Sequence, residues 1–194
     1  MSLLVLKTNS KTNYFVLIME TNYLIVPGYG NSGVEHWQTY FENQLPNSFR
    51  IQQKSWEKPL RIDWVSAINE AIKSYNPETV VLVSHSMGGI AIAHWASEFG
   101  IKIKGAMIVA PPDLDNPWQD LGLESFAPIP LKKLPFPSVV VASTNDGWAT
   151  TERIKLFAEN WGSKLIFIEN VGHINATSGY GKWDEGLQIL KDSF

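Results

Sequence analysis

Residues 80–89 are Val80-Val81-Leu82-Val83-Ser84-His85-Ser86-Met87-Gly88-Gly89. The four apolar residues predict a buried strand, and the apolar run 90–96 predicts a helix. A serine between a strand and a helix, with small residues two positions to either side, is typical of a nucleophile elbow. In that turn, strained backbone presents the serine hydroxyl at the end of the sheet. The pattern therefore predicts Ser86 as a nucleophile and the backbone N–H of Met87 as a donor to a developing oxyanion.

Short apolar segments alternate with amphipathic segments along the rest of the chain. Runs rich in Val and Ile predict strands covered on both faces at 23–26, 80–83, 106–110, 139–142 and 165–168. Helical spacing predicts helices at 34–43, 63–75 (with Asp63 as N-cap), 87–99, 151–161 and 183–191. This alternation predicts an α/β fold, with a mostly parallel central sheet and helices on both faces.

The chain is long enough for one well-buried domain, which we assign to residues 21–194. Residues 1–20 hold two short apolar runs separated by polar residues. Neither run has the length of a secretory signal or a membrane span. Two interpretations stay open: an extra strand or hairpin at a sheet edge, or an extension that precedes a translation start at Met19.

Composition narrows the classes of partner. The net charge is −3 and the basic residues are scattered, so we expect neither nucleic acid nor an anionic membrane as a partner. The sequence has no cysteine, which excludes disulfides, thiol catalysis and thiolate zinc sites. A chain without cysteine suits a cytoplasmic location. The oligomeric state stays open between monomer and dimer.

A serine nucleophile needs a base and an acid that orients the base. In hydrolases of this type they lie in loops after strands, in the chain order serine, acid, histidine. Asp146 follows the predicted strand 139–142, and His173 follows the predicted strand 165–168. We therefore predict Ser86 as nucleophile, Asp146 as orienting acid and His173 as general base, all at one edge of the sheet.

Other residues compete for these roles. Asp113 also follows a strand, and we favour Asp146 because its strand comes next in the expected order. His85 lies inside the elbow and is expected to point away from the nucleophile. His94 lies two helical turns further on and is expected to pack or to face solvent. His36 is a candidate pocket residue.

The loop after the first strand is Pro27-Gly28-Tyr29-Gly30-Asn31-Ser32-Gly33. Its glycines allow the backbone to approach a substrate closely. We predict the backbone N–H of Tyr29 as the second oxyanion donor. The glycine and lysine spacings of phosphate-binding loops are missing from this segment.

Seven prolines between residues 111 and 137 would break any regular helix. We predict an irregular excursion over the ligand-binding end of the sheet, with one short turn at 118–122 and only a minimal lid. The residues expected to line the substrate pocket are His36, Trp37, Trp56, Trp118, Phe126 and Trp148.

Further sequence motifs, spread over most of the chain, resemble those of a known protein family. They are 26–33 with His36-Trp37-Gln38, Trp56 with Pro59 and Trp64, Ala110-Pro111-Pro112-Asp113, Ala142-Ser143 with Asp146, and Gly172-His173-Ile174-Asn175-Ala176 followed by Ser178-Gly179 and Gly181-Lys182-Trp183. Together with the elbow they resemble the small serine hydrolases of the retinoblastoma-binding-protein and YdeN type, in the α/β-hydrolase superfamily. The resemblance implies that fold and the triad Ser86, Asp146 and His173.

The chain departs from the family pattern in two places. Ser84 replaces the usual small residue of the elbow, which keeps the geometry feasible. Without cysteine the chain cannot carry an L-x-C-x-E motif, so a retinoblastoma-protein partner is not expected.

These features predict a serine hydrolase that cleaves a small ester, thioester or amide through an acyl-enzyme on Ser86. The expected partner is a small acyl compound, and the mechanism needs no metal and no organic cofactor. The alternative is a non-catalytic binding or scaffold protein that keeps the hydrolase fold. Against it, the chain holds one candidate for each catalytic role.

Overall fold

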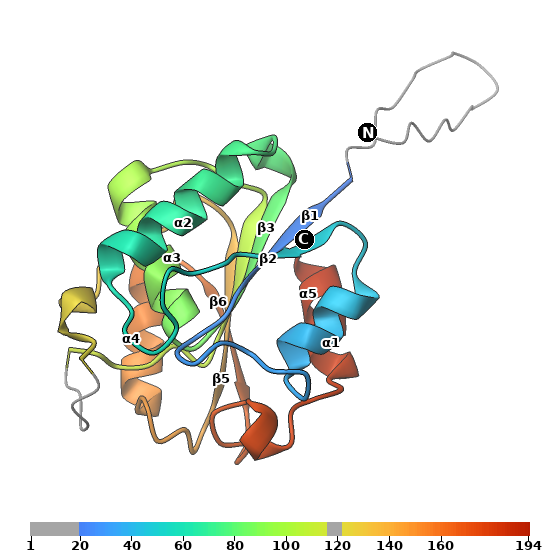
Figure 1. Ribbon diagram of the computed structural model, residues 1–194. Helices are drawn as coiled ribbons and strands as arrows, with labels where there is room; N and C mark the ends of the chain where they lie inside the picture. The colour runs from blue at the N-terminus through green and yellow to red at the C-terminus, as the bar shows by residue number, and fades with distance from the viewer. Residues whose placement is uncertain (1–19, 116–121) are drawn as a thin grey trace, which may run out of the picture.

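Six parallel strands form one sheet in the computed structural model, which describes residues 20–115 and 122–194 (Figure 1). In chain order the strands are β1 Asn22–Val26, β2 Ser48–Arg50, β3 Val80–His85, β4 Gly105–Val109, β5 Ser138–Ser143 and β6 Lys164–Ile168. Their spatial order is β2-β1-β3-β4-β5-β6. The order reverses between β1 and β3, and ligands of open α/β sheets bind at the carboxyl ends of strands at such a switch point.

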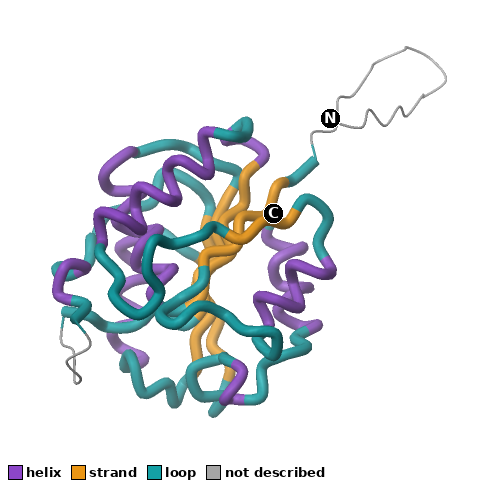
Figure 2. Tube along the Cα trace, viewed as in Figure 1, coloured by secondary structure: helices purple, strands orange, loops and turns teal. Residues whose placement is uncertain are grey.

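Helices cover both faces of the sheet (Figures 1 and 2). They are α1 Trp37–Gln44, α2 Arg61–Lys73, α3 Met87–Phe99, α4 Thr151–Trp161 and α5 Asp184–Ser193. Short 3-10 helices occupy Pro77–Thr79, Glu124–Phe126 and Ala176–Ser178. Helices α2, α3 and α4 lie on one face, and α1 and α5 lie on the other. The predicted fold class, an α/β fold with a mostly parallel central sheet and helices on both faces, is confirmed.

The sheet separates two apolar clusters, one under each layer of helices. The larger cluster packs strand residues such as Leu82 against Trp64, Trp95 and Phe157 of α2, α3 and α4. The smaller cluster includes Trp37 of α1. Every residue of β3 and of β5 is buried, because both strands are central and covered on both faces.

The main differences between the elements and the predictions concern β2 and the starts of α1 and α2. The edge strand β2 was not predicted, because Ser-Phe-Arg is too short and too polar to show a strand pattern. Helix α1 begins at Trp37 rather than at residue 34, since Val34 is 84% exposed in the preceding loop. Helix α2 begins at Arg61, so Asp63 lies in its first turn and is not the N-cap.

The described part of the proline-rich segment is irregular, as predicted, and its regular structure is one 3-10 turn at Glu124–Phe126. Arg153 of α4 holds the start of the segment against this helix by ion pairs with Asp113, at 3.0 Å, and with Asp115. Phe126 was expected in the pocket but lies fully buried in the larger cluster, edge-on to Trp64. The prediction was wrong because this side chain fills the space between α2 and α3.

Several sequence predictions fall outside the described residues. Residues 1–19 carry the two interpretations of the N-terminus, and Trp118 with most of the turn at 118–122 lies in the gap at 116–121. No helix of the described part is both long and apolar enough to cross a membrane.

Candidate active site

Ser86 lies in strained backbone between β3 and α3. Its φ is 53° and its ψ is −127°, a conformation that residues other than glycine rarely adopt. Its backbone N–H donates to the carbonyl of Val109 at 2.9 Å, which extends the pairing of β3 with β4 by one residue. The turn places the Ser86 hydroxyl at the carboxyl end of the sheet, next to the switch point.

Two glycines allow β1 and its loop to pack against this turn. A Cβ on Gly88 would overlap the Val26 carbonyl and lie 2.8 Å from the Pro27 carbonyl oxygen. A Cβ on Gly28 would lie 2.8 Å from the Ser86 Cβ. The loop after β1 therefore approaches the serine closely because neither contact position carries a side chain.

Gly88→Ala should destabilise the protein by about 3 kcal/mol, because the added methyl group meets the backbone of β1 and of the residue after it. Urea unfolding followed by tryptophan fluorescence measures the change. Gly33→Ala is the matched control, since a Cβ there meets nothing within 4 Å. If Gly88→Ala were as stable as the wild type, a methyl group would fit between α3 and the backbone of β1, and the close contact described here would be wrong.

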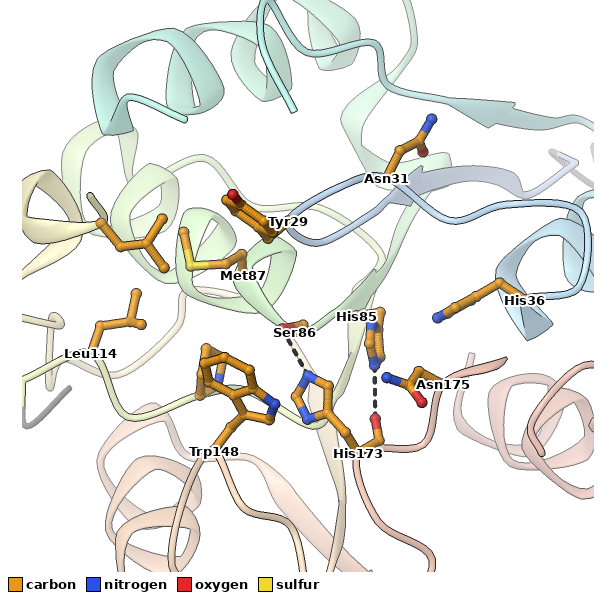
Figure 3. Close-up of a pocket in the computed structure, with 12 residues that line it drawn as sticks. Tyr29, Asn31, His36, His85, Ser86, Met87, Leu114, Trp148, His173 and Asn175 are labelled. Carbon is orange, nitrogen blue, oxygen red and sulfur yellow. Dashed lines mark hydrogen bonds between the residues drawn. The ribbon is translucent and has the colours of Figure 1, made fainter. Parts of the chain in front are cut away.

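Ser86, His173 and Asp146 form a continuous hydrogen-bonded row. His173 Nε2 lies 3.0 Å from Ser86 Oγ (Figure 3). His173 Nδ1 lies 2.8 Å from Asp146 Oδ2 and 3.0 Å from Oδ1. The Asp146 side chain is 1% exposed and also accepts the Trp148 backbone N–H at 3.0 Å. A buried carboxylate in this position can hold the imidazole with its proton on Nδ1, which leaves Nε2 free to accept the serine proton.

The loops that carry the acid and the base are joined by side-chain hydrogen bonds. Asn145 Oδ1 accepts the backbone N–H of Gly172 at 2.8 Å, and Ser143 Oγ accepts that of Val171 at 3.0 Å. Strands β5 and β6 are in register up to their last residues, so both loops leave the sheet at the same level. The polar residues 143–145 thus bring Asp146 next to His173.

The competing acid has a different role in the structure. Asp113 accepts from Arg153 Nε at 3.0 Å, and its backbone N–H donates to the Trp148 carbonyl. It therefore holds the proline-rich segment on α4, and the carboxylate beside His173 belongs to Asp146. His94 packs in the core as one of its two expected alternatives, with Nε2 at 2.8 Å from the Phe126 carbonyl.

His85 lies beside the triad. It was expected to point away, yet its Nε2 lies 2.9 Å from the backbone carbonyl oxygen of His173 (Figure 3). The contact joins residues 88 positions apart, so no local pattern could predict it. Burial, followed by the charges of His173 and His36, lowers the pKa of His85 well below 6.5. His85 is therefore a neutral N–H donor that holds the backbone of the predicted base.

Trp37 holds the next residue of the same loop. Its indole N–H donates to the Ile174 carbonyl at 2.8 Å. Ile174 is fully buried with a φ of 48°, which is strained for a β-branched residue. Trp37 was expected in the pocket, but it is fully buried in the smaller cluster, because its ring is enclosed by Phe41 and Trp183.

The triad opens into a cavity of about 210 Å³. Of the residues considered from sequence, its lining includes Ser86, His173, Tyr29, Met87, His36 and Trp148. The lining residues that were not predicted for the site from sequence are Asn31, His85, Pro112, Leu114, Leu123 and Asn175. Trp56 does not line the cavity; its ring packs against Trp64, and its carbonyl accepts the Gly30 N–H.

His36 is a neutral side chain at the N-terminal end of α1. It is 6% exposed, and its Nδ1 accepts the backbone N–H of Gln38, which makes it the N-cap of the helix. Burial, then the charge of Arg50, then that of His173 lower the pKa of His36 from 6.5 to about 4. The ring is therefore uncharged at neutral pH.

Acid should destabilise the fold through this histidine. Because its folded-state pKa is below the unfolded value, the unfolded chain binds more protons between pH 4 and 6.5, and stability falls as the pH drops through that range. Between about pH 7 and about pH 4.5, His36→Asn should lose about 2 kcal/mol less free energy of unfolding than the wild type. Asparagine keeps the helix cap, so urea titrations at both pH values isolate the ionisation. Parallel losses in both proteins would contradict the burial of a neutral His36.

Possible metal ligands do not gather in the described residues: no group of three or more His, Asp and Glu side chains is placed to hold an ion.

A family model and several solved structures match this chain. The serine hydrolase family model matches residues 23–192. A YdeN-like hydrolase from Pectobacterium atrosepticum is 32% identical, with 90% of each chain covered and a TM-score of 0.79. The ydeN gene product of B. subtilis is 18% identical, with 91% of this chain and 99% of that chain covered and a TM-score of 0.78.

A third solved structure extends the fold comparison. It is an α/β hydrolase from the metagenome of sediments from the lagoon of Mar Chica, Morocco, which is 16% identical, with 89% of this chain and 90% of that chain covered and a TM-score of 0.68. Comparison with curated protein sequences finds no significant match. Because the family model spans the elbow and both partner loops, the chain belongs to the serine hydrolase family and is of the YdeN type within the α/β-hydrolase superfamily.

Proposed function

We propose that this protein hydrolyses small carboxylic esters, with related thioesters or amides as further substrates, through an acyl-enzyme on Ser86. The observation that supports this most is the row of hydrogen bonds from Asp146 through His173 to Ser86 Oγ, which ends at the cavity. A nucleophile, a base within hydrogen-bond reach and a group that orients the base are the parts that acyl transfer requires.

The proposed reaction has two halves. Ser86 Oγ attacks the carbonyl carbon of the ester while His173 Nε2 takes the hydroxyl proton, and a tetrahedral oxyanion forms. His173 then returns the proton to the leaving alcohol oxygen as the carbon–oxygen bond breaks, which leaves the acyl group on Ser86. Water then gives a proton to the same nitrogen as its oxygen attacks the acyl carbon. The bond from this carbon to Ser86 Oγ breaks, His173 returns the proton to Oγ, and the carboxylic acid leaves.

Two backbone amides are suited to stabilise the oxyanion. Met87 is the first residue of α3, so its N–H has no acceptor within the helix and lies at the positive end of the helix dipole. Among residues 20–115 and 122–194, the Tyr29 N–H donates to no protein acceptor. Gly28 lies against the Ser86 side chain, which brings the Tyr29 amide to the same site.

The cavity favours a small substrate. Its volume of about 210 Å³ is below the ~300–1,000 Å³ of most ligand pockets. Leu114, Leu123 and Trp148 line it with apolar surface. An acyl group of only a few carbons fits such a space, and longer chains would have to extend into solvent.

A panel of p-nitrophenyl esters of increasing acyl length, together with aminoacyl amides, tests the proposal when it is combined with fluorophosphonate labelling. We expect labelling, and hydrolysis that is fastest for acyl groups of about two to four carbons, the size that this cavity can enclose. If the wild type neither hydrolysed any compound nor became labelled, the alternative of a binding protein with a hydrolase fold would replace this proposal.

A further inference from the structure

The cavity beside Ser86 has two chemically different ends. Leu114 and Trp148 lie at one end, and His36, His85 and Asn175 gather at the other, with Ser86 between them (Figure 3). The apolar end is suited to bind a short hydrocarbon group of the substrate. The polar end contributes nothing to the proposed acyl transfer apart from the contact of His85 with the His173 backbone, so it calls for a separate explanation.

His36 directs one hydrogen-bond donor toward this end. Its Nδ1 accepts the Gln38 backbone N–H, so the proton of the neutral ring must be on Nε2. In the described part of the chain, Nε2 has no protein hydrogen-bond partner, and the residue, which is 6% exposed, lines the cavity. Figure 3 shows a ring nitrogen at the tip of His36 directed toward His85 and Asn175. Because this N–H opens into the cavity, a bound molecule that offers an acceptor atom could pair with it.

Asn175 supplies a second donor. Its Oδ1 accepts both the backbone N–H and the hydroxyl of Ser178, at 3.0 Å each. A backbone N–H can only donate, so the oxygen of the amide must face Ser178 and the NH₂ group must face away from it. Within residues 20–115 and 122–194, Nδ2 donates to no protein group, and the residue lines the same cavity.

We propose that His36 Nε2 and Asn175 Nδ2 form a subsite that donates hydrogen bonds to an uncharged acceptor oxygen of the substrate, such as an ether, a hydroxyl or a second carbonyl. The proposal rests on the esterase function above and adds a substrate class to it: esters with a short apolar group on one side of the scissile bond and an oxygen-bearing group on the other.

The charges near the subsite favour a neutral acceptor over a carboxylate. None of the described lysine or arginine side chains lines the cavity. Arg50 is the cation that affects His36, but its guanidinium is paired with Glu42 and also donates to Asn31 and Thr39. An anion would therefore lose its hydration without gaining a free cation, which is unfavourable in a buried site.

The test compares pairs of esters that differ by one CH₂-to-oxygen exchange. On the acyl side the pair is p-nitrophenyl butanoate and p-nitrophenyl methoxyacetate, and on the alcohol side it is butyl butanoate and 2-methoxyethyl butanoate. The measured quantity is the ratio of kcat/KM for the oxygen ester to that for the all-carbon ester. In one of the two pairs, His36→Asn should lower this ratio about fivefold to tenfold relative to the wild type, the range expected for one neutral hydrogen bond.

The variants separate recognition from structure. His36→Asn keeps a capping side chain at the start of α1 but is too short to place a donor where Nε2 lies. Asn175→Asp keeps the oxygen that accepts from Ser178 and removes the NH₂ group, and it should lower the same ratio. Because both substrates are measured on the same variant, intrinsic reactivity and any damage to the base cancel in the comparison.

The possible outcomes separately test the subsite, the uncharged acceptor, the substrate class and the hydrolase function. Ratios unchanged by both substitutions, in both pairs, would overturn the subsite while the hydrolase function stands. Preference for monobutyl succinate over butyl butanoate would overturn the uncharged class. Fluorophosphonate labelling without hydrolysis of any of these esters would overturn the substrate class alone, and loss of both labelling and hydrolysis in the wild type would overturn the proposed function itself.

Discussion

Ser86→Ala should lower kcat for the best ester of the panel by about 10⁶-fold, as loss of the nucleophile does in serine hydrolases with an intact triad. Alanine removes the only atom that His173 Nε2 contacts in the catalytic row, at 3.0 Å, and it removes the acceptor of the acyl group. The variant should also lose all covalent labelling by a fluorophosphonate, which intact-protein mass spectrometry detects as the absence of the adduct mass.

A second serine of the same elbow is the matched control. Ser84 is fully buried, and its hydroxyl donates to the Met107 carbonyl at 3.2 Å rather than facing the cavity. Ser84→Ala should therefore still be labelled. Continued labelling of Ser86→Ala, or loss of labelling only in Ser84→Ala, would show that another residue is the nucleophile.

The sequence was most informative where chemistry depends on local pattern. The elbow was predictable because strand, serine and helix are consecutive, and Gly88 is required by a backbone contact with β1. The pairing of His173 with Asp146 could be anticipated because strands end in register in a parallel sheet, which places loops after β5 and β6 at one level. Chain order alone therefore selected Asp146 over Asp113.

Contacts between distant residues were not predictable. His85 bonds to the His173 carbonyl, and Trp37 bonds to the Ile174 carbonyl, across 88 and 137 positions of the chain. Nothing in the identity of a histidine or a tryptophan tells whether its N–H meets a backbone carbonyl or a ligand. Trp37 was for that reason misplaced in the pocket, although the indole N–H did need a partner.

The pocket was the least predictable part for a related reason. Its apolar wall includes Leu114 and Leu123, which come from irregular backbone without any periodic pattern. The position of this segment depends on Arg153 of α4. This side chain pairs with Asp113 and Asp115, which lie 40 and 38 residues earlier in the chain. When long-range ion pairs fix the position of a segment, residue spacing does not show which of its side chains line the pocket. For this reason the aromatic residues predicted for the pocket included Phe126 and Trp56, which pack elsewhere.

Asp146→Asn should lower kcat by about 10⁴-fold and leave KM nearly unchanged, although the side chain keeps its size. The carboxylate accepts from the Trp148 backbone N–H and from His173 Nδ1. In the variant the amide oxygen still has to accept the backbone N–H, so the NH₂ group faces His173 Nδ1 and donates to it. The imidazole then carries its proton on Nε2, where it cannot take the proton of Ser86.

Nitrogen-15 NMR of the histidine side chains checks this cause directly, because the proton should move from Nδ1 to Nε2 of His173 in the variant. Asp113→Asn is the control, since it alters the other carboxylate that follows a strand but leaves the imidazole untouched. It should weaken the ion pair with Arg153 and lower stability, with kcat within about tenfold of the wild type. If Asp146→Asn kept most of its activity while Asp113→Asn lost it, the acid of the row would have to be reassigned, and the tautomer of His173 would need another source of control.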